Sequence, residues 1–328
     1  MEFTLINGVH VSRLGLGTWA IGGSEWGNVP DDEAVDTCLA IFDYGINLID
    51  TAPIYGRGHA EEIVGRAMRT SGKRDRTYLA TKAGLDWRDD GVYANSTAPR
   101  LRKELEDSLR RLGTDYIDLY QIHWPDTILP MEQVAEVMQR FLDEGKIRAI
   151  GVSNFSASQM DAFRKVAPIH SNQPPYNIYE RAIDDETLPY CNRHSIAVLA
   201  YSSLCRSLLA GRLTAETQFA EDDVRRVDPK FQQPRFSQYL AATRKLDDFA
   251  REHYGKRVLH LAMRWVLDRP GISAALWGAK RPEQLLPVED ILGWSLDDSA
   301  MRAIDAIVRE TVTDPVGPEY LAPAVRRD

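Results

Sequence analysis

The sequence predicts an α/β protein in which eight parallel strands close into a (β/α)8 barrel. Three observations lead to this prediction: eight short apolar runs alternate with stretches of helical spacing, no Pro/Ser-rich linker divides the chain, and 328 residues suit one barrel. An open doubly wound sheet is the alternative for such an alternation, but it more often stops near about six strands. We therefore expect residues 1–328 to form a single domain.

The first expected element is an N-terminal β-hairpin, because "FTLI" and "VHVS" flank Asn7 and Gly8. Asn-Gly is the strongest two-residue hairpin signal, since both turn positions need a positive φ. The eight barrel strands are then expected, in chain order, in "RLGLGT", "INLIDTA", "TYLATKA", "YIDLYQIHW", "RAIGVSN", "IHSNQP", "AVLAYSS" and "ISAALWG".

Helices are expected between these runs, where apolar residues recur every three to four positions. The expected ranges are 31–44, 97–112, 131–145, 157–166, 182–194, 239–253 and 282–292, with an extra C-terminal helix at 297–310 and helical spacing at Ile63, Ala67 and Met68. Residues 84–96, 213–238 and 311–328 are too long or too polar for minimal connections. The first two follow the third and seventh strands, which puts long loops on the C-terminal face, where barrel chemistry occurs.

The composition is that of an ordinary soluble protein, with 44% apolar and 27% charged residues and a net charge of −8. This charge argues against a nucleic-acid or anionic-membrane surface. The N-terminal residues lack the features of a secretory signal, and no apolar run approaches the ~18 residues of a spanning helix. Cys38, Cys191 and Cys205 are odd in number and far apart, which disfavours a disulfide framework or a cysteine zinc site. We expect a cytoplasmic protein.

Four ionisable residues lie at the ends of neighbouring strands. Asp50 ends the second run, Tyr55 follows it, Lys82 ends the third and His123 ends the fourth. Taken singly, each has a commoner structural explanation, as a turn residue, a packed aromatic or a satisfied core side chain. Together they share one rim of one barrel, which indicates a site.

These residue types suit acid–base chemistry. A tyrosine hydroxyl titrates near ~10, so it donates a proton poorly at neutral pH unless a nearby ammonium lowers its pKa. Lys82 would supply that ammonium, and Asp50 would keep it charged in a partly buried rim. His123 would orient a substrate oxygen. The sequence therefore predicts a tyrosine general acid.

The motifs "NLIDTAPIYG", "ATKAG", "DLYQIHWPD" and "GVSNF" resemble, in order and spacing, the signatures of the aldo-keto reductases. The resemblance covers essentially the whole chain, and "LGLGTWAIGG", "QPPYN", "DPKFQ" and "ALWGA" are most similar to bacterial NADP-dependent reductases of the glycerol dehydrogenase type. It implies a (β/α)8 TIM barrel that binds NADP without a Rossmann fold. The activity it implies is the interconversion of small aldehydes or ketones with alcohols or polyols, including glyceraldehyde- or glycerol-like substrates.

The resemblance also implies residue roles. Tyr55 matches the proton donor, Lys82 and Asp50 its tuning pair, and His123 the residue that orients the carbonyl. Ser153, Asn154 and Gln173 match the groups that hold the nicotinamide carboxamide, and Tyr201 matches the aromatic residue that stacks on the nicotinamide ring. Hydroxyl and amide groups of this kind suit a neutral amide ligand.

The phosphate end of the cofactor is expected along two loops. Ser202, Leu204 and Arg206 match the loop beside the pyrophosphate. Gly278, Lys280, Arg281 and Gln284 follow the eighth strand and open a helical segment, where a glycine, two cations and a helix N-terminus favour an anion. The cations match a clamp on an adenosine 2′-phosphate, which favours NADP over NAD, and Gln284 matches an adenine contact.

The turn after the first barrel strand is expected to face both the cofactor and the substrate. Gly15 and Gly17 match the first two glycines of the dinucleotide-binding motif GxGxxG, but the next glycine, Gly22, lies too far along the chain to be the third. The turn instead brings Thr18 and Trp19 near the cofactor. Trp19, Trp87 and Trp124 all start rim loops, and we expect them to form an apolar substrate wall.

Two other functions fit the sequence less well than an enzyme of this kind. A nicotinamide-binding redox sensor or regulatory subunit on the same scaffold is less favoured because all four catalytic positions are present. A metal-dependent hydrolase needs converging ligands. Only Asp50 and His123 qualify, beside a repelling lysine, so we expect no metal. The expected partner is a small-molecule substrate, and the expected state a monomer or weak homo-oligomer.

Overall fold

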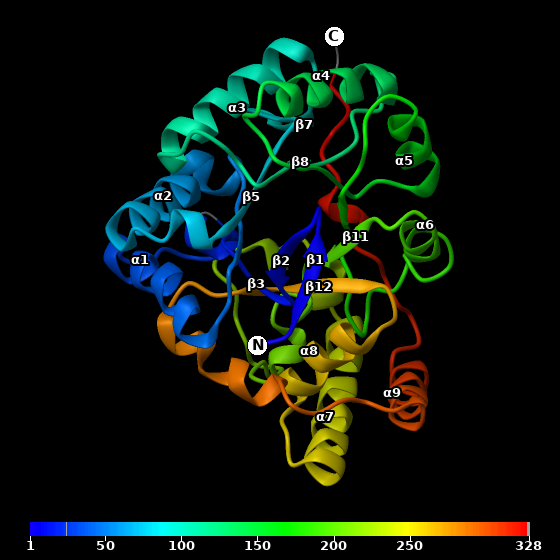
Figure 1. Cartoon of the computed structure of the whole chain (residues 1–328). Helices are drawn as coiled ribbons and strands as arrows, with labels where there is room; N and C mark the ends of the chain where they lie inside the picture. Colours follow the sequence, from blue (N-terminus) through cyan, green and yellow to red (C-terminus); the bar gives the residue numbers. More distant parts are fainter. Residues whose placement is uncertain (24, 327–328) are drawn as a thin grey trace.

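The computed structural model of the chain describes residues 1–23 and 25–326. Its centre is a closed barrel of eight parallel strands, with helices around it (Figure 1). The strands follow chain order around the barrel: β3 (Leu14–Gly17), β4 (Leu48–Asp50), β5 (Tyr78–Ala83), β8 (Leu119–Ile122), β9 (Ile150–Ser153), β10 (Ser171–Gln173), β11 (Ala197–Ala200) and β12 (Ile272–Gly278). Each lies within one of the eight predicted runs, so the predicted (β/α)8 TIM barrel is confirmed.

The predicted N-terminal hairpin is also present. β1 (Phe3–Ile6) and β2 (Val9–Ser12) pair antiparallel around Asn7 and Gly8, whose φ values of 49° and 78° are those that the Asn-Gly signal requires. The hairpin covers the end of the barrel that faces the viewer in Figure 1. Apolar side chains of the hairpin and of the strands form one buried cluster there, which leaves the opposite end of the barrel for polar residues.

The helices are α1 (Asp31–Ala40), α2 (His59–Ser71), α3 (Ala98–Leu112), α4 (Met131–Asp143), α5 (Ala157–Arg164), α6 (Thr187–Arg193), α7 (Arg235–Tyr254), α8 (Val258–Asp268) and α9 (Asp298–Thr311). α8 was not predicted because residues 258–267 are all buried, so no polar face produces a helical period. Of the predicted helix at 182–194, only α6 is helical in the structure. Residues 282–291 form a 3₁₀ helix with Pro287 inside, since proline removes a backbone donor that an α-helix needs.

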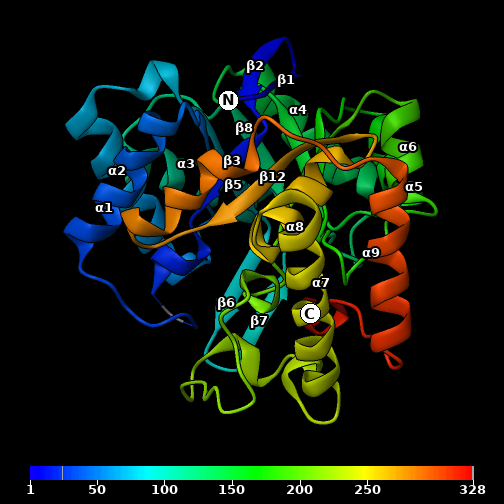
Figure 2. The ribbon, with the colours of Figure 1, turned by 90° about the horizontal axis from the view of Figure 1, so that it is seen from below.

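Three segments gather on the face opposite the N-terminal hairpin (Figure 2). The range 84–96, predicted as a loop, instead contains a second hairpin, β6 (Leu85–Arg88) and β7 (Gly91–Ala94). Residues 213–234 form a long loop with two 3₁₀ turns, and the C-terminal tail after α9 runs beside β7, where Ala324 N donates to the carbonyl of Val92 at 3.0 Å. These segments surround the carboxyl ends of the barrel strands.

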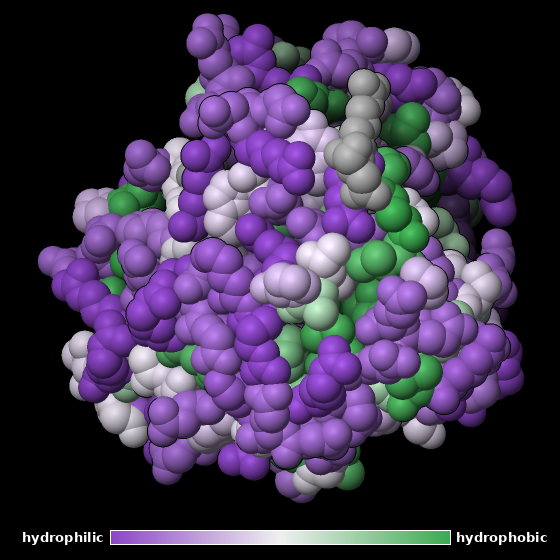
Figure 3. All heavy atoms as spheres, turned by 90° about the horizontal axis from the view of Figure 1, so that it is seen from above, coloured by the Kyte–Doolittle hydropathy of each residue, from purple (hydrophilic) through white to green (hydrophobic). Residues whose placement is uncertain are grey.

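The surface is in keeping with the composition. The face seen from above in Figure 3 is mostly hydrophilic, with a band of hydrophobic side chains running through it. Within the described part of the chain, no helix combines the length and apolar character needed to cross a bilayer.

Candidate active site

The centre of the site is an ion pair between the ends of two neighbouring strands. β4 and β5 pair in parallel with Asp50 beside Ala80, so that Asp50 and Lys82 both reach the C-terminal rim. The Nζ of Lys82 donates to Asp50 Oδ1 at 2.5 Å and to the carbonyl of Thr51 at 3.1 Å. The Lys82 side chain is 0% exposed, and a buried ammonium needs such partners because its removal from water is costly.

Tyr55 adjoins this ion pair. Its hydroxyl accepts a hydrogen bond from Lys82 Nζ at 3.1 Å, and its ring lies edge-on to that of His123, with centroids 5.8 Å apart. The turn that carries Tyr55 depends on Gly56, whose φ is 61° and where a Cβ would lie 2.1 Å from the carbonyl oxygen of Gly22. The structure therefore brings the four residues predicted from strand ends into one cluster.

Two buried glutamine side chains also donate hydrogen bonds to Asp50. Its Oδ2 accepts hydrogen bonds from Gln173 Nε2 at 2.8 Å and from Gln121 Nε2 at 3.2 Å. Gln121 was not predicted as a site residue. The signal that could have found it is its spacing, because residues two apart in a strand point to the same face and Gln121 precedes His123 by two.

The electrostatics of the cluster keep the phenol protonated. Burial alone would lower the pKa of Lys82, but Asp50 and Tyr55 outweigh it and raise the pKa above its ordinary value. Burial raises the pKa of Tyr55, against the opposing effect of Lys82. Lys82 therefore lowers the pKa of Tyr55, as predicted, but burial outweighs it and the pKa lies above its ordinary value. Burial and the nearby Lys82 hold the pKa of His123 well below its ordinary value, so its ring is neutral at pH 7.

Two cavities meet at the cluster. One of about 300 Å³ lies along the loops after β11 and β12, and another of about 690 Å³ lies under the β6–β7 hairpin and the tail. Trp19, Tyr55, Gln173 and Tyr201 line both. A ligand that fills the smaller cavity would therefore meet one in the larger cavity next to the Tyr55 hydroxyl.

The predicted residues divide between the two cavities. Every predicted substrate residue lines the larger one, which places Trp87 and Trp124 there beside Tyr55. Every predicted cofactor residue lines the smaller cavity except three. Ser153 and Asn154 line the larger cavity, and Arg281 faces Glu33, with Nε and Oε2 3.5 Å apart.

A chain of hydrogen bonds joins the residues predicted for the nicotinamide end. Ser153 Oγ donates to the carbonyl of Gln173 at 2.7 Å, and Asn154 Nδ2 donates to that of His123 at 3.0 Å. Tyr201 Oη donates to Asn154 Oδ1 at 2.9 Å. These bonds fix polar groups at the junction of the two cavities before any ligand binds.

The residues predicted for the phosphate end are held by the loop after β12. Gln284 Oε1 accepts from the backbone N–H groups of Lys280 and Arg281, at 2.8 and 3.1 Å. Lys280 lines the smaller cavity, and its Nζ donates to the carbonyls of Trp26 and Gly27. Burial and the positive charges of Arg281 and a second arginine lower the pKa of Lys280.

That second arginine, Arg225, was missed by the motifs. It lines the smaller cavity from the 213–234 loop, pairs with Asp223, and lies over the ring of Trp26 at 5.3 Å from the centroid. Val224 N donates to the carbonyl of Glu25 at 3.2 Å, which joins the loop to the segment after β3. A single charged residue in a polar loop carries no local pattern, so the sequence offered no signal for it.

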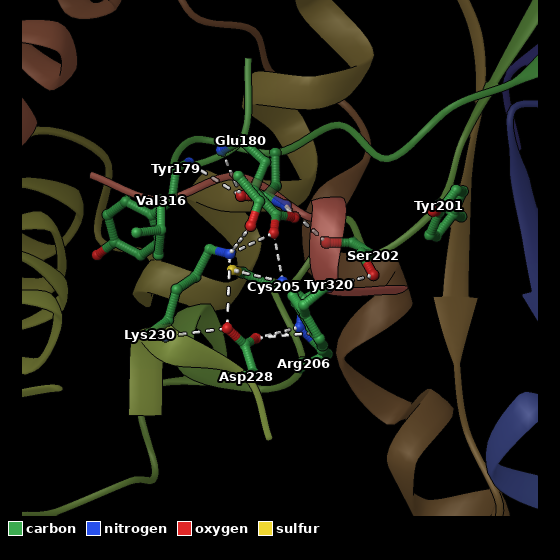
Figure 4. Close-up of polar contacts among 12 residues, drawn as sticks. Tyr179, Glu180, Tyr201, Ser202, Cys205, Arg206, Asp228, Lys230, Val316 and Tyr320 are labelled. Atoms are coloured by element: carbon green, nitrogen blue, oxygen red, sulfur yellow. Dashed lines mark hydrogen bonds and ion pairs between the residues drawn. The ribbon is translucent and has the colours of Figure 1, made fainter. Parts of the chain in front are cut away.

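Arg206, predicted beside the pyrophosphate, lies at the wall of the smaller cavity but is 4% exposed. Its guanidinium donates to Asp228 Oδ2 at 2.7 Å and to Glu180, and to Ser202 Oγ at 3.1 Å (Figure 4). Most of its donors are therefore bound within the protein.

A model of the Aldo/keto reductase family matches residues 13–309. The chain belongs to the aldo/keto reductase family. It is 52% identical over 330 residues to Aldo-keto reductase YhdN of Bacillus subtilis, with all of both chains covered. It is 33% identical to the NADH-specific methylglyoxal reductase of Escherichia coli, over 89% of this chain and 93% of that one.

Among solved structures, the chain is similar to the glycerol dehydrogenase AKR11B4 from Gluconobacter oxydans. The TM-score is 0.88 at 49% sequence identity, with 98% of this chain and 99% of that chain covered. The resemblance drawn from the motifs is thereby confirmed: this aldo/keto reductase is a nicotinamide-dependent oxidoreductase that acts on small carbonyl or alcohol substrates. Among residues 1–23 and 25–326, no group of three His, Cys, Asp or Glu side chains is placed to hold a metal ion.

Proposed function

We propose that this enzyme reduces small aldehydes and ketones with NADPH and, in reverse, oxidises small alcohols or polyols. The observation that carries the proposal is the Tyr55 hydroxyl, which accepts a hydrogen bond from the buried Lys82 ammonium and lines both cavities. The residues of the smaller cavity fit a dinucleotide, because Gly278 leaves open space where a side chain would stand and Lys280 supplies a cation. When bound, the nicotinamide supplies the hydride.

The protein's own groups supply the proton and its stabilisation. Tyr55 donates its proton to the carbonyl oxygen, and the Lys82 ammonium at 3.1 Å stabilises the phenolate that remains. Asp50 keeps Lys82 charged throughout. The neutral His123, beside Tyr55, offers a ring nitrogen that positions the substrate oxygen. A positioned acid of this kind contributes a factor of about 10² to 10⁴ in rate.

Two observations support NADP as the cofactor. Lys280 and Arg281 stand at the start of the 3₁₀ helix after β12, and Arg225 adds a third cation from the loop opposite. Cations in such a place attract an adenosine 2′-phosphate. Membership of the family does not decide this point, because the Escherichia coli relative is named NADH-specific.

The larger cavity supports a small substrate. Trp19, Trp87 and Trp124 give it apolar walls, and Tyr55 and His123 supply polar groups at the catalytic cluster. Charged side chains also line it, namely Glu25, Arg57, Arg88 and Asp89. The name of the Gluconobacter relative, a glycerol dehydrogenase, makes polyols and glyceraldehyde-like aldehydes the first substrates to test.

The test is a panel of aldehydes, ketones and polyols followed by NADPH absorbance, with NADH in parallel. We expect turnover of small hydroxyaldehydes, and a higher kcat/KM with NADPH than with NADH. Equal kcat/KM values for the two cofactors would contradict the choice of NADP. A chain that binds NADPH but turns over no carbonyl would favour the redox-sensor alternative instead.

A further inference from the structure

Four charged side chains are buried together beneath the loops of the C-terminal face. Glu180 is 3% exposed, Arg206 4%, and Asp228 and Lys230 0%. Glu180 follows β10, Arg206 follows β11, and the other two belong to the 213–234 loop. Buried charges are retained only when each one is paired, so this arrangement depends on all three segments together.

The pairing is complete and balanced. Arg206 bonds to both carboxylates, through Nε to Asp228 Oδ2 at 2.7 Å and through Nη2 to Glu180. Lys230 Nζ lies 2.7 Å from Glu180 Oε1 and 3.6 Å from Asp228 Oδ1. Figure 4 shows the two cations between the two carboxylates.

The C-terminal tail closes over this charge network, which we define as Glu180, Arg206, Asp228 and Lys230. Tyr320 Oη donates to Asp228 Oδ2 at 3.0 Å, and Lys230 Nζ donates to the carbonyl of Gly317 at 3.0 Å. Both cations also lie over the Tyr320 ring, at 5.5 Å for Arg206 and 5.8 Å for Lys230. A cation over an aromatic face adds to the attraction.

The network links residues that line different cavities. Arg206 lines the smaller cavity and bonds to Ser202 there, whereas Tyr320 lines the larger one. One oxygen, Asp228 Oδ2, accepts from both Arg206 and Tyr320. Asp228 Oδ1 accepts from the backbone N–H of Lys230 at 2.9 Å, which fixes the carboxylate on the loop.

We propose that Asp228 is a positioning residue that couples the two binding cavities, holding Arg206 against the cofactor and Tyr320 against the substrate. The inference rests on the proposed function, since it assigns the smaller cavity to NADPH and the larger to the carbonyl substrate. Its consequence is that a change in the substrate wall at Tyr320 alters the affinity for NADPH, although no atom of Tyr320 lines the smaller cavity.

The first variant is Tyr320→Phe, which removes only the hydroxyl that donates to Asp228. Because a hydrogen bond to a charged group is being lost, we expect the NADPH Kd, measured by fluorescence without substrate, to rise at least about threefold. KM for the carbonyl should rise by a similar factor, whereas kcat should stay within about twofold because Tyr55 and Lys82 are untouched. A general structural defect would lower kcat as well.

Leu321→Ala is the matched control. Leu321 lines the larger cavity from the same 3₁₀ turn as Tyr320, but its apolar side chain cannot donate a hydrogen bond to the charge network. We expect this variant to raise KM and leave the NADPH Kd unchanged. If Tyr320→Phe behaves like Leu321→Ala, with the NADPH Kd unchanged, the coupling does not exist and the proposal is overturned.

Asp228→Asn tests the carboxylate itself and Asp228→Glu tests its rescue. The asparagine variant should weaken both NADPH and carbonyl binding, and the glutamate variant should restore part of each. If Asp228→Asn does not fold, Tyr320→Phe still decides the matter. The failure of the proposed function is distinguishable, because wild-type protein would then show no NADPH binding or no turnover, whatever the variants do.

Discussion

Two buried lysines of this chain each lie beside a carboxylate and a tyrosine, but the tyrosine makes a different hydrogen bond in each cluster. Lys82 and Lys230 are both fully buried. The oxygen of Tyr55 accepts a hydrogen bond from the Lys82 ammonium, whereas the hydroxyl of Tyr320 donates to the Asp228 carboxylate. The residue types are the same, but the direction of the hydrogen bond at the phenol is reversed.

This difference decides which tyrosine can act as an acid. The Tyr55 side chain lines the larger cavity, and the ammonium beside it would stabilise the phenolate that remains after a proton is donated there. The Tyr320 proton is bound to a carboxylate, and burial together with Asp228 raises the pKa of that phenol. Residue type alone therefore does not separate the proposed acid, Tyr55, from Tyr320; the partner of the phenol oxygen does.

The largest expected effect comes from removing the Tyr55 hydroxyl. Tyr55→Phe should lower the rate of carbonyl reduction by about 10² to 10⁴, because the acid is lost while the cavity keeps its shape. Single-turnover kinetics with bound NADPH measures this, with NADPH affinity as the control. Turnover close to that of the wild type would disprove Tyr55 as the proton donor and would remove the distinction from Tyr320.

The second test exchanges each lysine for methionine. Lys82→Met should lower kcat at least about tenfold, since the phenolate loses its cation. Lys230→Met should leave kcat near that of the wild type but destabilise the fold by about 3–5 kcal/mol, because an uncompensated charge is left buried. Urea unfolding and steady-state kinetics on both variants check this. A kcat lowered equally by both would remove the contrast between the two clusters.

The third test concerns the phosphate end of the smaller cavity. Replacing Lys280 and Arg281 by alanine should weaken NADPH about tenfold or more and NADH much less, since only NADPH carries a 2′-phosphate. Because Arg281 faces Glu33 and does not line the cavity, the single Lys280→Ala variant should show most of the loss. Equal losses of NADPH and NADH affinity, measured by fluorescence titration, would refute the phosphate clamp.

The smallest expected effect is in the pH profile. In the proposed reaction the protonated form of Tyr55 is the active one. Because burial raises the pKa of Tyr55 above its ordinary value, activity should be lost only at a pH above that value. The pKa of His123 lies well below 6.5, so no break is expected at 6.5. The kcat/KM of carbonyl reduction, measured from about pH 6 to about pH 11, checks this, since an unperturbed tyrosine titrates near about 10. A loss of activity with an apparent pKa well under 10 would show that Lys82 outweighs burial after all.

Much of the fold can be predicted from the sequence because the alternation of apolar runs and helical spacing is a local pattern. All eight barrel strands were predicted from short apolar runs, and parallel strands bring their carboxyl ends to one rim. That rule alone is enough to place Asp50, Lys82 and His123 together before any contact is known. The motifs then identify the family, which the comparisons confirm.

Tertiary structure alone decided what depends on contacts between distant segments. The fully buried α8 has no period to detect, and the partners of Asp228 come from loops about 20 to 90 residues away in sequence. The net direction of the Tyr55 pKa shift is also decided by packing, because the sequence shows the charge of Lys82, which lowers this pKa, but not the burial that outweighs it. Spacing along a strand is a local property, whereas burial and the direction of a hydrogen bond exist only after the loops have packed.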